Sequence, residues 1–210
     1  MIRVLIADDH LIVREGLKQV LSKYIDIEVV AEAETCQQVL KKVDEETFDV
    51  ILLDVKMPDG LGLDIIKKIQ EKSTDLPILM LSAYPEEQYA MAALRSGAAG
   101  YLVKESLPKE LIKAIREVFL GRKYISSTLA GKMADYLQSE EKVLPHEKLS
   151  SREFQVMCLI AAGKTVSVIA DELKISVKTV STHRTRALDK MEMENNIEFA
   201  RYAAKHGLIE

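Results

Sequence analysis

The sequence predicts an α/β protein in which a doubly wound, five-stranded parallel sheet precedes a second, all-α domain with a helix-turn-helix. Over residues 1–120, short apolar strands alternate with amphipathic helices, which is typical of a parallel sheet with helices on both faces. A polar stretch containing Pro145 then interrupts the periodicity. Two short helical segments joined by a tight turn follow it, as in a helix-turn-helix.

The first domain is expected to alternate strand and helix five times. The strands are expected at about 2–7, 27–33, 49–53, 77–82 and 99–103. A helix starts at Leu11, where apolar residues begin to recur at helical spacing, and Thr35 is the expected N-cap of the next one. The remaining helices are expected at about 62–72, 86–96 and 106–119. In such a sheet, ligands bind beyond the carboxyl ends of the strands.

Five polar residues stand at these carboxyl ends: Asp8, Asp9, Asp54, Ser82 and Lys104. Any one of them alone would more often be a helix cap or a solvated charge. Three carboxylates together would repel one another, and Mg²⁺ relieves the repulsion because it binds carboxylates, water and a phosphoryl oxygen. Lys104 and the Ser82 hydroxyl suit an anion, and a carboxylate can accept a phosphoryl group. The pattern predicts Mg²⁺-assisted phosphoryl transfer onto a carboxylate.

Over about residues 1–120 the sequence resembles the receiver domain of bacterial two-component response regulators. The matching segments are Asp8-Asp9, Asp54 in Leu-Leu-Asp-Val-Lys-Met-Pro-Asp-Gly, Ser82-Ala83, and Lys104 after Gly-Ala-Ala-Gly-Tyr-Leu-Val. The resemblance implies that Asp54 accepts phosphate from the phosphohistidine of a sensor histidine kinase. It also implies that Asp9, Asp54 and the Lys56 carbonyl bind Mg²⁺, with Asp8 assisting through water.

The same resemblance implies a switch pair, Ser82 and Tyr101. The hydroxyl would move to the phosphoryl group while the ring turns inward. An amphipathic tyrosine ring suits both positions, although an ordinary strand aromatic is the alternative interpretation of Tyr101. Lys56 and Tyr84 follow Asp54 and Ser82 by two residues, and we expect them to flank the path of a hydrolytic water and to tune the lifetime of the phosphate.

The domain boundaries are expected at the polar stretch. We expect a receiver over 1–120, a linker with a helix over 121–148, and a helix-turn-helix domain over 149–210. Gly121 ends the fifth helix of the receiver. Ser126 or Ser127 is the expected cap of the linker helix, which would run to Leu137, and the polar residues after it are expected to be exposed.

The C-terminal domain begins with a predicted capping box, in which Ser150 is the N-cap and Glu153 the third helical residue. A second helix is expected from Val166 to Leu173, and Ser176 is the expected cap of the third helix. The inner face of this third helix is expected to comprise Val177, Val180, Ala187, Leu188 and Met191.

The opposite face of the third helix is the candidate DNA-reading surface, because the second helix of this motif lies in the major groove. Its stripe contains Lys178, Ser181, Thr182 and Thr185, and the flanking residues Arg184, Arg186 and Lys190 can reach phosphates. A merely solvated helix face is the alternative. Ser and Thr are mediocre helix formers but good groove contacts, which favours DNA binding.

Four further segments resemble the LuxR-type helix-turn-helix domain, so that the whole chain is similar to the NarL/FixJ family of response regulators. They are Leu149-Ser-Ser-Arg-Glu, Leu159-Ile-Ala-Ala-Gly, Ile169-Ala-Asp-Glu-Leu-Lys-Ile-Ser and Thr179-Val-Ser-Thr-His. The sequence departs from the family pattern in two places. Ser181 replaces the commoner Lys, and the segment Val166-Ser167-Val168 is less polar than usual. The resemblance also implies that a final helix, about 196–206, pairs two domains, so that a phosphorylated homodimer binds an inverted repeat in double-stranded DNA.

Composition restricts the class of protein. The 210 residues carry a net charge of −4, which excludes a uniformly basic coat for nucleic acid. However, residues 1–120 hold 15 basic and 21 acidic residues, whereas residues 164–190 hold six and three. No apolar run approaches the roughly 20 residues of a membrane span, so no membrane partner is expected. The only cysteines, Cys36 and Cys158, are expected to be buried thiols, and the protein is expected to be cytoplasmic.

The preferred function is a DNA-binding transcriptional regulator that is switched by phosphorylation and is not an enzyme. An aspartyl-phosphate phosphatase or mutase is one alternative, but such enzymes place a second acid two residues after the nucleophile, where this chain has Lys56. The other alternative is a regulator that binds DNA without phosphorylation and uses its receiver only for dimerisation.

Overall fold

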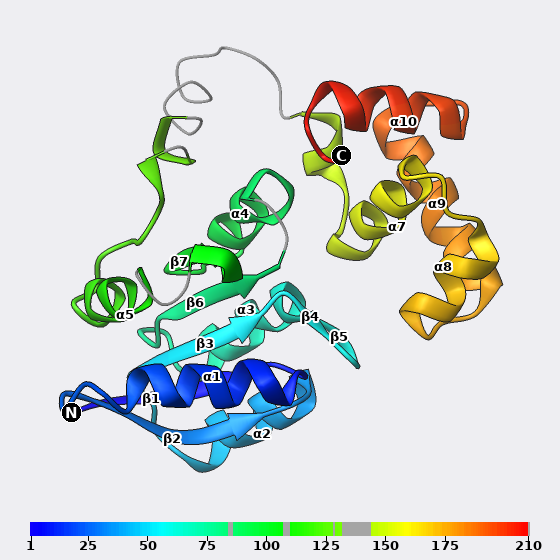
Figure 1. Cartoon of the computed structure of the whole chain (residues 1–210). Helices are drawn as coiled ribbons and strands as arrows, with labels where there is room; N and C mark the ends of the chain where they lie inside the picture. The colour runs from blue at the N-terminus through cyan, green and yellow to red at the C-terminus, as the bar shows by residue number, and fades with distance from the viewer. Residues whose placement is uncertain (84–85, 107–109, 128, 132–143, 210) are drawn as a thin grey trace. The chain divides into compact units, whose positions relative to one another are not determined.

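The computed structural model describes residues 1–83, 86–106, 110–127, 129–131 and 144–209. The chain divides into two compact units, Met1–Met133 and Ala134–Glu210. The first contains a five-stranded parallel sheet with helices, and the described part of the second is helical (Figure 1). The predicted fold class is therefore confirmed.

The sheet has the strand order β2-β1-β3-β6-β7, and all neighbouring strands are parallel. The strands are β1 (Ile2–Ala7), β2 (Ile27–Ala33), β3 (Val50–Asp54), β6 (Ile78–Ser82) and β7 (Gly100–Val103). Every residue of β3 and β6 is buried, as expected of central parallel strands. The chain moves outward from β1 to β2 and then returns to β3, so the topological switch point lies between β1 and β3.

Helices cover both faces of the sheet. They are α1 (Leu11–Leu21), α2 (Cys36–Glu45), α3 (Gly62–Lys72), α4 (Glu86–Arg95) and α5 (Leu111–Phe119). In Figure 1, α1 crosses in front of the sheet and α3 lies behind it. Helices α1 and α5 share one core with alternate strand residues such as Ile6, Leu52 and Leu79. The intervening strand residues, such as Ile51 and Leu53, are buried as well.

Three features of the first unit differ from the prediction or extend it. An antiparallel hairpin, β4 (Lys56–Met57) with β5 (Gly60–Leu61), follows Asp54 and was not predicted. The predicted fifth helix started too early, because the 3₁₀ turn η1 (Lys104–Ser106) precedes α5. After α5 the chain returns along β7, where the Tyr124 N–H donates to the Ala99 carbonyl at 2.9 Å.

Gly100 and Ser126 determine how the chain after α5 returns along β7. A Cβ on Gly100 would lie 2.6 Å from the Tyr124 carbonyl oxygen, so only glycine lets the returning chain approach so closely. Ser126 caps the next residues by accepting the Leu129 N–H at 3.0 Å. The remainder of the predicted linker helix and the predicted residue Tyr84 lie outside the described residues.

The second unit contains η2 (Pro145–Lys148), α7 (Ser151–Ala161), α8 (Val166–Leu173), α9 (Val177–Met191) and α10 (Asn196–Lys205). The predicted capping box is confirmed: the Glu153 N–H donates to the Ser150 hydroxyl, and the Ser150 N–H donates to the Glu153 carboxylate. Lys174 ends α8 in the left-handed conformation at φ 52°. Ser176 then caps α9 by accepting the Thr179 N–H at 3.0 Å, so that three residues join the two helices.

Most of the predicted inner face of α9 is buried, but Val177 is a correction. Val180, Ala187, Leu188 and Met191 are buried, whereas Val177 is 50% exposed. Val177 is the first residue of the helix, and helical side chains tilt toward the N-terminus. Its side chain therefore projects past the start of α9 rather than onto the core.

Cys36 is buried and Cys158 is half-buried, both as free thiols, and burial raises the pKa of each to about 12. In the described part of the chain, no helix combines the length and the apolar character that a bilayer crossing requires.

Candidate functional site

The predicted acidic site forms at the switch point of the sheet, where β1 and β3 end. Asp8 is fully buried and Asp54 is 5% exposed. Lys104 follows β7, and its ammonium Nζ lies 2.5 Å from Asp8 Oδ2 and 2.9 Å from Asp54 Oδ2. Three residues that are far apart in the sequence thus meet at one edge of the sheet, with the cation bridging two carboxylates.

Burial and charge oppose each other in this cluster. Burial raises the pKa of Asp54 to about 6, and the repulsion from Asp8 adds to the rise, although the Lys104 ammonium limits it. Burial alone would lower the pKa of Lys104, but Asp54 and Asp8 outweigh it and raise that pKa. Above a pH of about 6 the Asp54 carboxylate is therefore ionised beside the Lys104 ammonium group.

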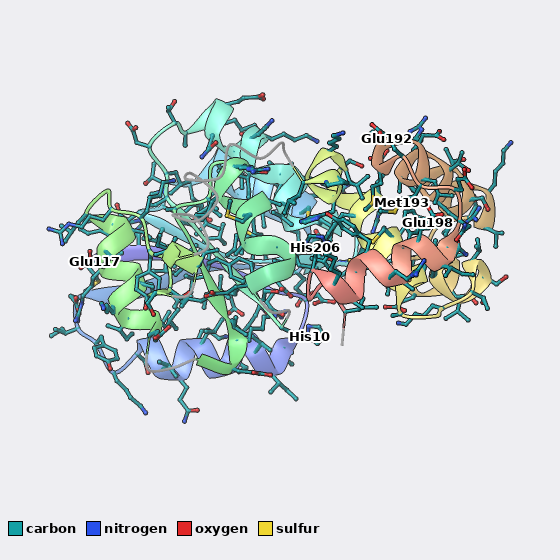
Figure 2. The ribbon with its side chains drawn as sticks, turned by 90° about the horizontal axis from the view of Figure 1, so that it is seen from above. His10, Glu117, Glu192, Met193, Glu198 and His206 are labelled. Atoms are coloured by element: carbon teal, nitrogen blue, oxygen red, sulfur yellow. The ribbon has the colours of Figure 1, made fainter. Side chains whose placement is uncertain are left out.

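His10 joins the acidic cluster and was missed by the sequence reasoning. It lies at the start of α1 and is labelled in Figure 2. Its Nδ1 lies 2.7 Å from Asp9 Oδ1 and 3.2 Å from Asp8 Oδ1, and its backbone N–H donates to Asp8. The only signal in the sequence is its position directly after the two acids.

The donor atoms of the cluster fit a divalent cation. Asp8, Asp9, His10 and Asp54 each offer one ligand atom, and these atoms all lie within 4.8 Å of one another. Most of them are carboxylate oxygens, which are the ligands that Mg²⁺ prefers. The exposed position of Asp9 leaves one side of the cluster open to water.

The β4–β5 hairpin after Asp54 is held in place next to the site by hydrogen bonds and close packing. The Lys56 N–H donates to the Asp54 carboxylate. A Cβ on Gly62 would lie 2.1 Å from the Asp54 carbonyl oxygen, so glycine is required where α3 begins. At the turn of the hairpin, the Asp59 carboxylate accepts the N–H groups of Cys36 and Gln37 at 2.8 and 2.9 Å. Burial would raise the pKa of Asp59, but these two donors outweigh it and lower the pKa.

The predicted switch residues lie on the neighbouring strands. Ser82 ends β6 and Tyr101 lies in β7, and both are fully buried. The register pairs Met80 with Tyr101 and Ser82 with Val103, so Ser82 stands at the same edge as Lys104, which follows Val103. The tyrosine ring is in an inward, buried position in this structure.

On α9, six of the seven predicted DNA-contacting residues are exposed, and only Arg184 is half-buried. The exposed residues are Lys178, Ser181, Thr182, Thr185, Arg186 and Lys190. They lie on one side of a helix whose N-terminus is capped by Ser176. The Thr182 hydroxyl donates to the Lys178 carbonyl at 2.9 Å, which leaves its lone pairs and its methyl group for an external partner.

Two of the seven predicted contacts, Arg184 and Lys190, have partners within the second unit. Arg184 Nε donates to Asn196 Oδ1 at 2.6 Å, and Lys190 Nζ lies 2.6 Å from Glu153 Oε2. These bonds tie α9 to α10 and to the capping box of α7. A phosphate contact by either residue stays a prediction, and it would compete with these bonds.

Two family models match the chain. Residues 4–116 match the response regulator receiver domain, and residues 147–203 match the bacterial regulatory proteins of the luxR family. The first match contains the acidic cluster with Lys104, and the second contains the capping box, α8 and α9.

Relatives extend over the whole chain. Response regulator UvrY of Escherichia coli (strain K12) is 37% identical over 209 residues, which cover 99% of this chain and 96% of the relative. Transcriptional regulatory protein LiaR of Bacillus subtilis (strain 168) is 38% identical over 210 residues and is covered completely. Among solved structures, RcsB from Salmonella enterica serovar Typhimurium, bound to promoter rprA in the presence of phosphomimetic BeF₃⁻, is 28% identical. Its TM-score is 0.67, with 97% of this chain and 98% of that chain covered.

Proposed function

The chain belongs to the NarL/FixJ family of response regulators, and from this we propose which of its residues carry out the switch. It is a phosphorylation-switched, DNA-binding transcriptional regulator, and it is not an enzyme. The observation that supports the residue assignment best is the Lys104 ammonium, which lies within 2.9 Å of the carboxylates of both Asp8 and Asp54.

Asp54 is the proposed phosphoacceptor. An oxygen of its carboxylate forms a bond to phosphorus while the N–P bond of the phosphohistidine of a sensor histidine kinase breaks. The attacking carboxylate must be ionised, and a pKa of about 6 leaves Asp54 ionised at pH 7.5. The Lys56 N–H already donates to this carboxylate, which keeps it oriented.

The proposed Mg²⁺ ligands are Asp9, Asp54 and the Lys56 carbonyl, with Asp8 acting through water. When bound, Mg²⁺ supplies positive charge that offsets the charge of the phosphoryl oxygens. Lys104 would then exchange its bond to Asp54 for a phosphoryl oxygen, because the acceptor carboxylate loses its charge when it becomes an acyl phosphate. Ser82 would donate its hydroxyl to another phosphoryl oxygen, and Tyr101 in its buried position would hold the active form.

The second unit is the proposed DNA-reading module, with α9 in the major groove. Ser181, Thr182 and Thr185 would reach base edges, and Lys178 and Arg186 would contact phosphates. The exposure of all five side chains supports this assignment. Helix α10 would pair two modules on an inverted repeat, and a structure of RcsB contains two dimers on two parallel DNAs. Because the protein would need access to chromosomal DNA and to the phosphohistidine of the kinase, we propose that it acts in the cytoplasm.

Labelling with radioactive acetyl phosphate tests the acceptor. The full chain should acquire a stable label that requires Mg²⁺, and Asp54→Ala should abolish it without loss of the fold, because the Asp54 side chain contributes little packing. Asp75→Ala, which removes an exposed acid from the same unit, should label like the wild type. Labelling of Asp54→Ala at the wild-type rate would refute the assignment. Absence of label in the wild type would instead favour a regulator whose receiver serves only for dimerisation.

A further inference from the structure

The β2–α2 connection is taken as residues 34–37, which are the two residues between the elements and the first two residues of α2. It is linked to both loops of the acidic site although it supplies no proposed metal ligand. One loop contains Asp8 and Asp9 after β1, and the other is the β4–β5 hairpin, which carries Lys56. Arg14 joins the first loop to the connection, and Asp59 joins the second loop to it.

Arg14 is a buried cation with three partners. Its side chain is 5% exposed and emerges from α1. Nη1 donates to the Asp8 carbonyl at 2.8 Å, Nε donates to Glu32 at 3.1 Å, and Nη2 pairs with Glu34 in the connection. Because the donors of a guanidinium have fixed directions, these bonds fix the peptide group between Asp8 and Asp9.

Asp59 makes the corresponding link on the hairpin. Its two carboxylate oxygens accept the N–H groups of Cys36 and Gln37, the first two residues of α2. Thr35 caps only the Gln38 N–H, so the Asp59 carboxylate satisfies the two N–H groups before it. Asp59 thereby fastens the hairpin to the start of α2.

We propose that Arg14 and Asp59 are positioning residues for the divalent-cation site, because they fasten its two ligand-bearing loops to the same β2–α2 connection. The proposal rests on the proposed function. Mg²⁺ requires nearly ideal octahedral geometry with short bonds, so a loop that shifts by a fraction of an ångström loses affinity. Residues that orient metal ligands typically contribute a factor of ten or more to affinity.

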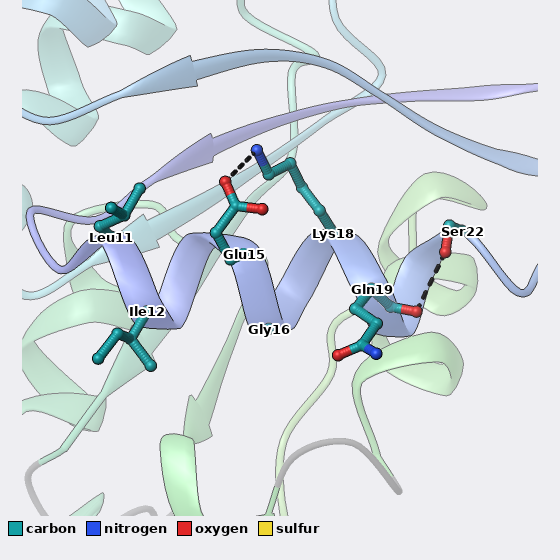
Figure 3. A pocket seen from close by; sticks show the side chains of 7 residues that line it. All are labelled: Leu11, Ile12, Glu15, Gly16, Lys18, Gln19 and Ser22. Atoms are coloured by element: carbon teal, nitrogen blue, oxygen red, sulfur yellow. Dashed lines mark hydrogen bonds and ion pairs between the residues drawn. The ribbon is translucent and has the colours of Figure 1, made fainter.

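The sign of the effect separates positioning from simple electrostatics. Arg14 is a cation close to a cation site, so charge alone predicts that its removal strengthens Mg²⁺ binding. Positioning predicts the opposite. Lys18 provides the matched control, since it is a cation on the same helix that shares Glu32 with Arg14. Lys18 also pairs with Glu15 along α1 (Figure 3), and within the described residues it is bonded to carboxylates of Glu15 and Glu32 and not to Asp8.

The test is a titration of the full chain with Mg²⁺, followed through the ¹H–¹⁵N NMR spectrum, which reports affinity and folding together. Arg14→Met should weaken Mg²⁺ binding by about tenfold, whereas Lys18→Met should stay within about twofold of the wild type. An affinity of Arg14→Met equal to or tighter than that of the wild type would overturn the proposal. An equal weakening in Lys18→Met would also overturn it, because the loss would then not pass through Asp8.

Asp59 is exposed, so its variants test the proposal even where Arg14→Met reduces the folded population. Asp59→Ala should weaken Mg²⁺ binding several-fold, and Asp59→Asn should recover part of the loss because it keeps one acceptor oxygen without the charge. Equal losses in the two variants would assign the effect to charge and refute positioning. A wild type that binds no Mg²⁺ would refute the proposed function, whereas wild-type binding with unchanged variants would refute only the positioning role.

Discussion

The ionised carboxylate of Asp54 lowers the free energy of unfolding of the first unit. Its pKa rises from 3.8 to about 6 because it is buried, so the folded protein binds this proton more tightly than the unfolded chain does. The cost therefore develops between about pH 4 and pH 6 and is complete at higher pH. An ionised carboxylate in a buried pocket is suited to attack phosphorus and to bind a metal ion. When no metal ion is bound, its charge reduces the free energy of unfolding.

Asp54→Asn should consequently raise the stability of the first unit in the absence of Mg²⁺. We expect a gain of about 1–3 kcal/mol at pH 7.5 and about half of it at pH 5, measured by urea unfolding of the full chain. Asp75→Asn removes an exposed acid and should change stability little at either pH. A gain that does not decrease toward pH 5 would show that the charge of Asp54 is not its source.

Two exposed residues of α9 should affect DNA binding in different ways. Thr182→Ala should mainly relax sequence preference, at about 1–3 kcal/mol per lost base contact. Arg186→Ala should weaken binding to all sequences alike and reduce the slope of log affinity against log salt by about 1. Gel-shift titrations over a salt series measure both quantities.

Arg122→Ala is the control for the loss of an arginine, because Arg122 is exposed in the first unit, where it pairs with Glu117. It should leave the affinity and the salt slope nearly unchanged. If Arg186→Ala changed sequence preference instead, Arg186 would read bases rather than phosphates.

The residues of the acidic site were predictable to different degrees. Asp8, Asp54 and Lys104 were identified because parallel strands bring their carboxyl ends to one edge, and this rule needs only the strand pattern. Arg14 and Asp59 were not identified, because their roles depend on bonds to the backbone of other elements. An arginine on an amphipathic helix and an acid in a turn have no periodic signal that distinguishes them from solvated residues.

At the scale of elements, the capping serines decide where the helices of the second unit begin. Ser176→Ala should destabilise this unit by about 1 kcal/mol, because the Thr179 N–H loses its acceptor. Ser181→Ala is the same substitution inside the same helix, where alanine is the better helix former, so it should be neutral or slightly stabilising. Thermal denaturation of the full chain measures both, and equal effects of the two substitutions would contradict the capping role.

Elements with a long periodic pattern were predicted from the sequence, and short ones were not. The five strands and the helices α7 to α10 follow repeating apolar positions. The β4–β5 hairpin has strands of two residues, too short to show alternation, although Pro58-Asp59-Gly60 marks a turn. The start of α5 was predicted too early because Leu107 has helical spacing to Leu111, whereas the chain first forms a 3₁₀ turn over Lys104–Ser106.

At the scale of the molecule, the charge distribution matches the two proposed partners. The acidic first 120 residues collect carboxylates for a cation, while the region of α8 and α9 has an excess of basic residues for DNA. A single domain of this size reads only one short half-site, and two tethered domains gain affinity through effective concentration. Phosphorylation at the proposed acceptor Asp54 would therefore raise affinity by promoting the dimer, without any change in the proposed contacts of α9.

If phosphorylation acts through the dimer, the affinity gained on phosphorylation should depend on the number of half-sites in the DNA. On DNA selected from a random library, the full chain treated with acetyl phosphate and Mg²⁺ should bind an inverted repeat about 10²-fold more tightly than the untreated chain. On the same DNA with one half-site scrambled, treatment should change affinity little, and the salt slope should be about half as steep. Asp54→Ala should show no gain on either DNA. An equal gain on one and on two half-sites would contradict dimerisation and indicate that phosphorylation acts on the single DNA-binding domain.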